Sequence, residues 1–323
     1  MREKEYLKQS YAAILSSIGM ILLLAGLWML APLLVLLAYP EDRINAFSFA
    51  EPAGCLCLAG FLLRRIFKPA PHATLSIQEG GVIVLIAWGV VMVFSAWPFM
   101  AVLQLPFSRS LFEAVSGWTT TGLSVVDVTK AGPMILFWRS AMQLAGGAGL
   151  AIIMMSAIAG PTGVGVSTAE GRSDQLVPQV RQSARLVLII YTGYAAIGTL
   201  AYWMAGMSLF DAFNHSFAAV STGGFSTRPD SIGTWDSVAI EAVSVPLMVL
   251  GNLSFVTAWS LWRGRLRFVV RNGEVRLMAA LIPLSMAAAF VFTCRGLYPE
   301  TSKAFRVALF ETVSALTTTG FQT

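Results

Sequence analysis

Three polar stretches of nearly the same pattern recur along the chain, each a run of threonine, serine or glycine that closes on a glycine. Aligned on that glycine, they read FEAVSGWTTTGLS, NHSFAAVSTGGFS and FETVSALTTTGFQ, with Gly122, Gly224 and Gly320 in register. Backbone carbonyls and threonine hydroxyls offer only oxygen ligands, which suit a hard cation. Several such loops around one axis would present a ring of oxygens to a dehydrated cation. Glycine is needed where the chain turns through positive φ and packs close to that axis.

A single TTTG is more often an ordinary turn between helices, but three copies preceded by the same amphipathic run favour an ion-binding loop. Glu113, His215 and Glu311 each lie nine residues before the glycine. Two readings stay open for them. They are polar residues near a helix N-terminus, where glutamate is favoured by the helix dipole, or they form a polar ring that attracts cations or braces the loops from behind.

The composition places these loops in a membrane. Of the 323 residues, 56% are hydrophobic and 12% charged, whereas soluble domains are about one-quarter charged. Residues 11–38 are uncharged and mostly apolar, a longer run than the roughly 20 residues that cross a bilayer. Because this run exceeds the apolar region of a signal peptide and MREKEYLKQS carries mixed charges, we expect an uncleaved first helix.

The hydropathy pattern predicts an all-α integral membrane protein with alternating full spans and short apolar pieces. Runs of about 10–14 apolar residues beside full spans often mark re-entrant segments. Here each short piece precedes one of the threonine–glycine loops. The repeating unit is therefore a span, a half-helix, a loop and a second span, as expected for transporters built by internal duplication. The predicted spans are 11–38, 53–67, 80–103, 133–158, 186–207, 237–262 and 277–297, and the half-helices are 107–118, 208–220 and 302–316.

Basic residues support this topology. Fourteen of the 22 lysines and arginines fall on one side when the spans are counted alternately and the half-helices do not cross. The positive-inside rule makes that side, and the N-terminus, cytoplasmic. The positive charge thus sets topology, and we expect no nucleic-acid partner. The fourteen basic residues on the predicted cytoplasmic side are Arg2, Lys4, Lys8, Arg64, Arg65, Lys68, Arg172, Arg181, Arg185, Arg263, Arg265, Arg267, Arg271 and Arg276.

A few residues inside the spans allow more than one interpretation. Placing the charged Arg139 side chain in lipid costs free energy. We therefore expect it either to snorkel to the outer interface or to support the pore mouth. Gly146, Gly147 and Gly149 in LAGGAG indicate close helix packing or a hinge in a pore-lining helix. The three cysteines are odd in number and lie in or beside apolar runs, so neither a disulfide framework nor a metal site is expected.

At this point the sequence resembles the Trk/Ktr/HKT superfamily of potassium transporters and, within it, the bacterial Trk-type membrane subunits. The closest pieces are LFWRSAMQLAGGAGLAI, AGMSLFDAFNHSFAAVSTGGFST and ALFETVSALTTTGFQT. The resemblance implies four span–pore-helix–span repeats in a pseudo-fourfold array around one cation pathway, often with two extra N-terminal helices. It also implies that carbonyls at and before each glycine surround the transported K⁺. By match these residues are Thr120, Thr121, Gly122, Thr222, Gly223, Gly224, Thr318, Thr319 and Gly320.

The same resemblance implies how the chain is organised and regulated. We expect an N-terminal helix pair at 1–68, pore repeat 1 at 75–160, a cytoplasmic loop with repeat 2 at 161–270, and an incomplete repeat 3 at 271–323. The chain ends directly after the third loop, so we expect a fragment of a longer protein or a truncated reading frame, without the fourth repeat. Family members pair with a cytosolic nucleotide-binding regulatory subunit (TrkA-like) and form homodimers, so both partners are implied here.

The leading hypothesis is potassium uptake across the bacterial inner membrane, with K⁺ as the transported ion and no covalent cofactor. In plant relatives a serine in place of the first filter glycine accompanies sodium transport, so Gly122 favours potassium. Alternatives are a Na⁺-permeable or Na⁺/H⁺-coupled transporter (a symporter), and a non-conducting truncated subunit. An enzyme using Glu113 or His215 would need clustered ionisable residues in the spans. The chain has two histidines and few such carboxylates, so we expect no enzymatic activity.

Overall fold

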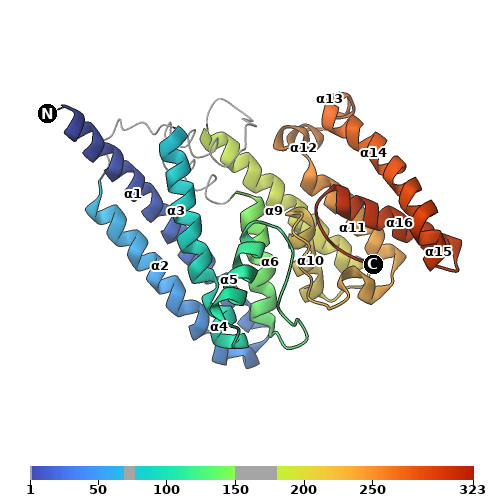
Figure 1. Ribbon diagram of the computed structural model, residues 1–323, viewed down its shortest axis with the longest axis horizontal. Helices are drawn as coiled ribbons and strands as arrows, with labels where there is room; N and C mark the ends of the chain where they lie inside the picture. The colour runs from blue at the N-terminus through green and yellow to red at the C-terminus, as the bar shows by residue number, and fades with distance from the viewer. Residues whose placement is uncertain (1, 69–76, 150–179) are drawn as a thin grey trace. The chain divides into compact units, whose positions relative to one another are not determined.

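The computed structural model describes residues 2–68, 77–149 and 180–323, and within these ranges every regular element is a helix (Figure 1). The prediction of an all-α fold is therefore confirmed. The helices are α1 (Arg2–Trp28), α2 (Phe47–Ile66), α3 (Ile77–Ser95), α4 (Trp97–Leu103), α5 (Phe107–Trp118), α6 (Pro133–Gly147), α9 (Val180–Met204), α10 (Leu209–Val220), α11 (Val238–Asn252), α12 (Phe255–Trp262), α13 (Leu266–Arg271), α14 (Gly273–Ala289), α15 (Arg295–Leu297) and α16 (Thr301–Leu316).

Five helical segments in the described residues are long and apolar enough to cross a membrane, which makes this a multi-pass membrane protein. The first combines α1 with the 3₁₀ turn Ala31–Leu37, and the last continues α14 through a π turn into α15. The predicted span 133–158 lies partly outside the described residues. The five segments are Leu7–Leu37, Phe47–Ile66, Gln78–Leu103, Arg185–Met204 and Gly273–Leu297.

The predicted span 237–262 is not one straight helix, because the chain bends by 120° between α11 and α12. Together the two helices are long and apolar enough for a broken span or a re-entrant segment. Helix α11 ends at Asn252, and Leu253 is extended. Ser254 then caps α12, its side chain accepting a hydrogen bond from the Thr257 amide. Cap residues satisfy the free amides of a new helix start, so the local sequence favours two helices over one.

The three predicted half-helices are present as α5, α10 and α16, within one residue of the expected bounds. Helix α10 begins at a cap in which the Ser208 hydroxyl accepts from the Asp211 amide. Its length of 12 residues is too short to cross a bilayer. The half-helices thus end within the fold and lead directly into the threonine–glycine loops.

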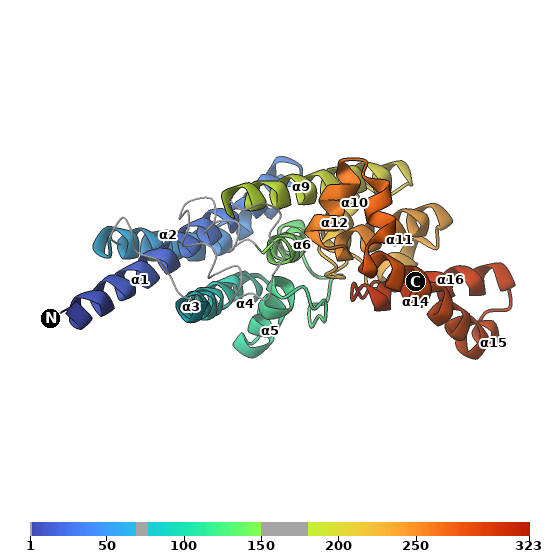
Figure 2. The same ribbon diagram turned by 90° about the horizontal axis from the view of Figure 1, so that it is seen from above.

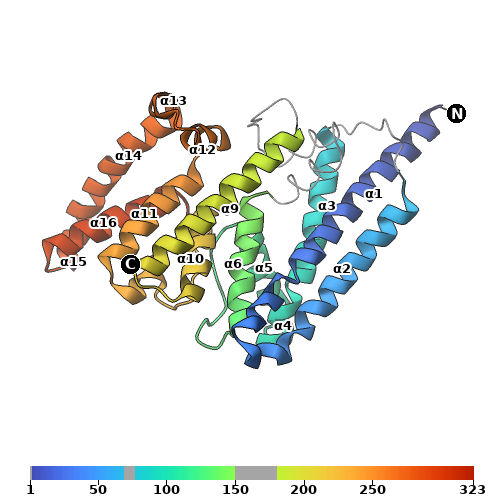
Figure 3. The same cartoon turned by 180° about the vertical axis from the view of Figure 1, so that it is seen from behind.

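The chain divides into two compact units. In the first, α1 and α2 lie side by side and run in opposite directions (Figure 3). Glycines allow this close packing, because a Cβ on Gly60 would lie 2.4 Å from the Gly19 carbonyl oxygen. Small residues at such contacts are typical of helices packed in lipid. In the same unit, the buried Asp42 carboxylate accepts a hydrogen bond of 2.8 Å from the Met134 amide in the first turn of α6.

The second unit contains all three threonine–glycine loops. Helix α10 lies beside α11, and α16 beside α14 (Figures 1 and 2). The core between them is mostly apolar, and its buried polar contacts include the hydrogen bond of 2.8 Å that Tyr202 donates to Ser244. This core fixes the half-helices that carry the loops. Its fully buried members include Tyr202, Ala212, Ala218, Val220, Met248 and Phe310.

Candidate functional site

The three half-helices end in the same hydrogen-bonded turn. The amides of Thr121, Gly223 and Thr319 donate to carbonyls five residues earlier, at 2.8–2.9 Å. The preceding amides, of Thr120, Thr222 and Thr318, donate to carbonyls three residues earlier. This pair of bonds is the Schellman motif, in which the residue after the helix takes the left-handed conformation.

Threonine occupies that left-handed position in all three loops, with φ of 53° at Thr120, 51° at Thr222 and 57° at Thr318. A β-branched residue with positive φ is a genuine outlier, and the conformation costs about 1–2 kcal/mol. In the described part of the chain the three hydroxyls have no hydrogen-bond partner. Strained backbone of this kind clusters at functional sites, so the repetition points to these loops.

The glycine two residues later also has positive φ, and neighbouring loops meet there. A Cβ on Gly122 would lie 2.2 Å from the Gly223 carbonyl oxygen. In the same way, a Cβ on Gly224 would lie 2.0 Å from the Thr319 carbonyl oxygen. Gly122 and Gly224 thus each receive the carbonyl of the residue that precedes the glycine of the next loop. Among the described residues, a Cβ on Gly320 would meet no atom within 4 Å.

The residue just before each glycine differs in how it is held. In the first and third loops a threonine hydroxyl contacts the threonine two residues earlier, Thr119 to Thr121 at 2.7 Å and Thr317 to Thr319 at 2.8 Å. The second loop has Gly223 instead. A Cβ there would lie 2.4 Å from Gln143 Cδ, so the missing side chain makes room for Gln143.

Gln143 projects from α6 and is fully buried. Its Nε2 donates to the Gly223 carbonyl at 2.5 Å, and its Oε1 accepts from the Phe225 amide at 3.2 Å. One side chain therefore fixes the backbone on both sides of Gly224. Sequence reasoning missed Gln143, although a buried amide within an apolar span is a signal in itself.

Arg139 lies one turn before Gln143 on α6 and is 2% exposed. Its guanidinium donates to the Ser226 carbonyl at 2.8 Å and to the Ser124 hydroxyl at 2.9 Å. It also lies 4.1 Å from the centre of the Phe225 ring, a cation–π contact. Of the two interpretations, the structure favours the brace over snorkelling, because Arg139 joins the segments that follow two different loops.

Two of the three residues nine positions before the glycine, His215 and Glu311, contact the chain just after the loops. His215 is fully buried, and its ring nitrogens lie 2.8 Å from the Asp211 carbonyl and 2.9 Å from the Ser226 hydroxyl. Glu311 accepts from the Thr323 amide at 2.8 Å. Glu113 is also fully buried. For His215 and Glu311 the geometry favours bracing from behind over attraction of cations.

The segments after the second and third loops are joined at their far ends. The Gly233 amide donates to the Gln322 carbonyl at 3.0 Å, and the Gln322 amide donates to the Ser231 hydroxyl. Nearby, Asp236 pairs with Lys303 at 2.8 Å and with Arg306. The hydrogen bond from Lys303, with a second from Arg306, holds the pKa of Asp236 below its usual value. The segments after the second and third loops are thus joined by hydrogen bonds, and ion pairs join the first of them to α16.

Close glycine packing seats the half-helix ends on the spans that follow. A Cβ on Gly146 of α6 would lie 2.0 Å from the Trp118 carbonyl oxygen, and one on Gly251 of α11 would lie 2.4 Å from that of Val220. Trp118 and Val220 both precede their loop glycine by four residues. For Gly146 the geometry therefore favours close packing over a hinge.

Five of the nine predicted site residues contact one another or a neighbouring loop residue, namely Thr121, Gly122, Gly223, Gly224 and Thr319. Thr120, Thr222 and Thr318 share the same left-handed turn, and a Cβ on Gly320 would meet no atom of the described residues within 4 Å. The atoms that these loops could offer to a cation as ligands are carbonyl and hydroxyl oxygens. No group of three or more His, Cys, Asp or Glu side chains that could hold a metal ion occurs in the described ranges. The arrangement therefore suits a hard cation held by backbone oxygens.

Comparison with known proteins gives concordant matches. The TrkH family profile, described as a cation transport protein, matches residues 55–265. The Trk system potassium uptake protein TrkH of Halomonas elongata is 31% identical over 97% of this chain and 66% of its own length. Its Escherichia coli K12 counterpart is 30% identical over the same shares. The crystal structure of the potassium transporter TrkH from Vibrio parahaemolyticus matches with a TM-score of 0.84 and 28% identity, covering 97% of this chain and 65% of that one. The chain thus spans just under two thirds of these relatives.

Proposed function

Because the chain belongs to the TrkH family of cation transport proteins, we propose that it forms part of a potassium uptake pathway across the inner membrane. K⁺ passes through a pore lined by the loops at Gly122, Gly224 and Gly320. The curated relatives carry the name of potassium uptake proteins, which supports this ion. No covalent chemistry is needed, and K⁺ is the cargo.

One observation carries the proposal: the glycines of the first and second loops each receive a carbonyl oxygen from the next loop. The same contact repeated between successive loops, Gly122 with Gly223 and Gly224 with Thr319, is expected of units related by rotation about one axis. A ring of carbonyls around such an axis replaces the hydration shell of a cation, as in selectivity filters. The proposed ligands are the nine residues Thr120, Thr121, Gly122, Thr222, Gly223, Gly224, Thr318, Thr319 and Gly320.

The wider organisation belongs to the same proposal. The helix pair 1–68 precedes three pore repeats, 75–160, 161–270 and 271–323, and the N-terminus is cytoplasmic. The arginines from Arg263 to Arg276 would then face the cytoplasm, where a nucleotide-binding regulatory subunit could dock. Homodimerisation is proposed on the family resemblance alone.

The test is uptake of ⁸⁶Rb⁺ by a strain without its own potassium uptake systems, expressing the gene product that contains this chain. Replacing Gly122 and Gly224 together with valine should abolish uptake, because both side chains would collide with carbonyl oxygens of the neighbouring loop. Gly206→Ala is the matched control, since Gly206 has φ of 108° but no atom within 4 Å of an added Cβ. It should keep uptake within about twofold of the unaltered protein, because the strain of about 1–2 kcal/mol falls outside the loops.

Equal membrane levels of all variants are checked by immunoblot. Normal, K⁺-selective uptake by the Gly122→Val/Gly224→Val protein would contradict the proposal. Competition by Na⁺ as strong as that by K⁺ would instead favour the sodium-permeable alternative. Uptake that depends on a Na⁺ or proton gradient would indicate coupled transport.

A further inference from the structure

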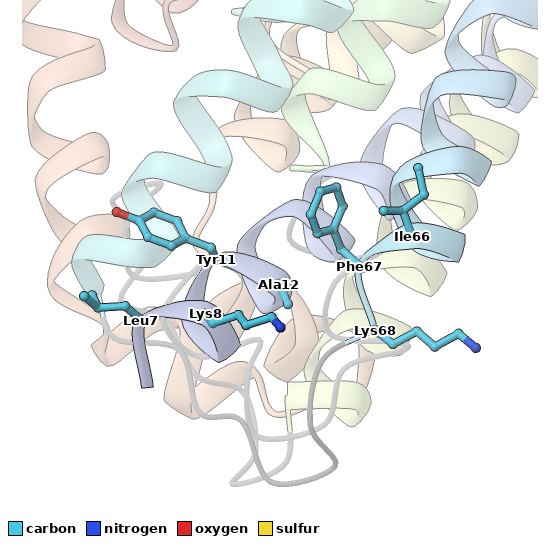
Figure 4. Close-up of a pocket in the computed structure, with 7 residues that line it drawn as sticks. All are labelled: Leu7, Lys8, Tyr11, Ala12, Ile66, Phe67 and Lys68. Carbon is cyan, nitrogen blue, oxygen red and sulfur yellow. The ribbon is translucent and has the colours of Figure 1, made fainter. Parts of the chain in front are cut away.

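A pocket of about 500 Å³ opens at one end of the α1–α2 pair and has no part in the proposed pore (Figure 4). It is lined from α1 by Leu7, Lys8, Tyr11 and Ala12, and from the last residue of α2 and the two residues after it by Ile66, Phe67 and Lys68. Figure 4 shows the two lysines below the rings of Tyr11 and Phe67. The pocket therefore combines two positive charges with apolar and aromatic walls.

The pocket lies at the level of a membrane surface. The two apolar spans to which it belongs start at Leu7 and end at Ile66. Because α1 and α2 run in opposite directions, these ends meet at the same side of the bilayer. Arg64 and Arg65 lie in the last turn of α2, so the surroundings are basic. Tyrosine and lysine at such a level typically anchor to the headgroup region.

No acidic side chain among the described residues neutralises either lysine. Within the part of the chain that the structure describes, Lys8 and Lys68 form no ion pair. Long lysine stems can lie along an apolar surface and bring the ammonium to the interface. Two unpaired ammonium groups at the rim of a pocket attract an anion.

The side chains that line the pocket indicate which class of anion it would bind. A free inorganic anion would be bound best by hydrogen-bond donors on all sides, but this pocket offers Leu7, Ala12 and two aromatic rings. An amphiphile with a phosphate group and acyl chains satisfies both parts, since its chains remain among apolar side chains in the lipid. Basic pockets between spans on the cytoplasmic side suit anionic lipid headgroups. We propose that this pocket binds the headgroup of an anionic phospholipid from the adjacent leaflet.

The experiment is native mass spectrometry of the purified protein in detergent, titrated with phosphatidylglycerol or with phosphatidylcholine of identical acyl chains. Phosphatidylglycerol should bind more tightly. In the Lys8→Gln/Lys68→Gln protein its binding should weaken about thirty-fold, the effect of two lysines near a membrane surface. Arg267→Gln/Arg271→Gln removes the same charge from exposed positions of α13 and should leave binding unchanged.

A steric variant tests the pocket independently of charge. Ala12→Phe fills the space and keeps both lysines, so it should also lose the bound phosphatidylglycerol, whereas Lys8→Arg/Lys68→Arg should retain it. The proposal is overturned by equal retention in the glutamine variant and the unaltered protein. It is also overturned by equal binding of the two lipids, or by complete displacement with millimolar inorganic phosphate, which would mark a site for free anions.

Discussion

In each of the three loops, threonine occupies a left-handed backbone position at which glycine would have the lowest conformational free energy. Thr120, Thr222 and Thr318 hold left-handed φ values that differ by only a few degrees, although a glycine there would avoid a cost of about 1–2 kcal/mol. What the threonine supplies is a hydroxyl with no partner among the described residues. These hydroxyls therefore remain available to a cation, and the strain is consistent with a functional site.

Gln143 and Gly223 form a pair whose two members depend on each other. Gly223→Ala should displace Gln143, because the new Cβ would lie 2.4 Å from Gln143 Cδ. Gln143→Ala should also destabilise, because it leaves the Gly223 carbonyl and the Phe225 amide without their partner, at about 1–3 kcal/mol for each buried group. The double variant should be less destabilised than the sum, by about 0.5–3 kcal/mol.

The measurement for this pair is thermal unfolding of the four proteins in detergent, together with ⁸⁶Rb⁺ uptake. Gly54→Ala is the control, because a Cβ at Gly54 would meet no atom within 4 Å, and it should show no coupling to Gln143→Ala. Strictly additive losses in the Gly223 and Gln143 variants would show that the contact between them carries no energy.

At the scale of elements, the loops are held on the side of the half-helices and on the side of the segments that follow. Glycines Gly146 and Gly251 of the following spans seat the C-terminal ends of α5 and α10. Beyond the loops, Arg139, His215 and Glu311 hold the segments that lead away. The loops are thus positioned by rigid helices on one side and by buried polar side chains on the other, which preorganises their carbonyls.

Helix packing in the first unit can be tested with two glycines of α2. Gly60→Val should lower stability by about 1–3 kcal/mol, the usual effect of overpacking, because its Cβ would lie 2.4 Å from the Gly19 carbonyl. Gly54→Val is the matched control, since a Cβ at Gly54 meets nothing within 4 Å. Thermal unfolding in detergent separates the two. If both variants unfold at the same temperature, the α1–α2 contact does not depend on glycine.

The sequence was informative about elements and much less so about contacts. The half-helices α5, α10 and α16 could be predicted because an amphipathic run and a glycine are local features. The bend at Asn252 was missed because average hydropathy over 237–262 conceals the short GNLS segment, although Ser254 is a cap residue that could have signalled it. Gln143 was missed because its partners Gly223 and Phe225 lie about 80 residues away, and periodicity carries no information on long-range pairing.

For the molecule as a whole, topology follows from where the charges lie. The re-entrant reading places Thr129 outside and Arg267 in the cytoplasm. Cysteines introduced at these positions, after replacement of Cys55, Cys57 and Cys294 by alanine, should report this. A membrane-impermeant maleimide should label Thr129→Cys in intact cells and Arg267→Cys only after permeabilisation. Labelling of Arg267→Cys in intact cells would reverse the proposed orientation.

The contact between neighbouring loops also bears on how the protein is made. The Gly223 carbonyl that lies against Gly122 belongs to a residue about 100 positions later. Since ribosomes add about 5–20 residues per second, the first loop emerges roughly 5–20 s before its neighbour exists. During this interval its carbonyls lack the wall that shields them from lipid. Biogenesis therefore requires that the insertion machinery, or water retained beside it, shelter the nascent loop until the next repeat arrives.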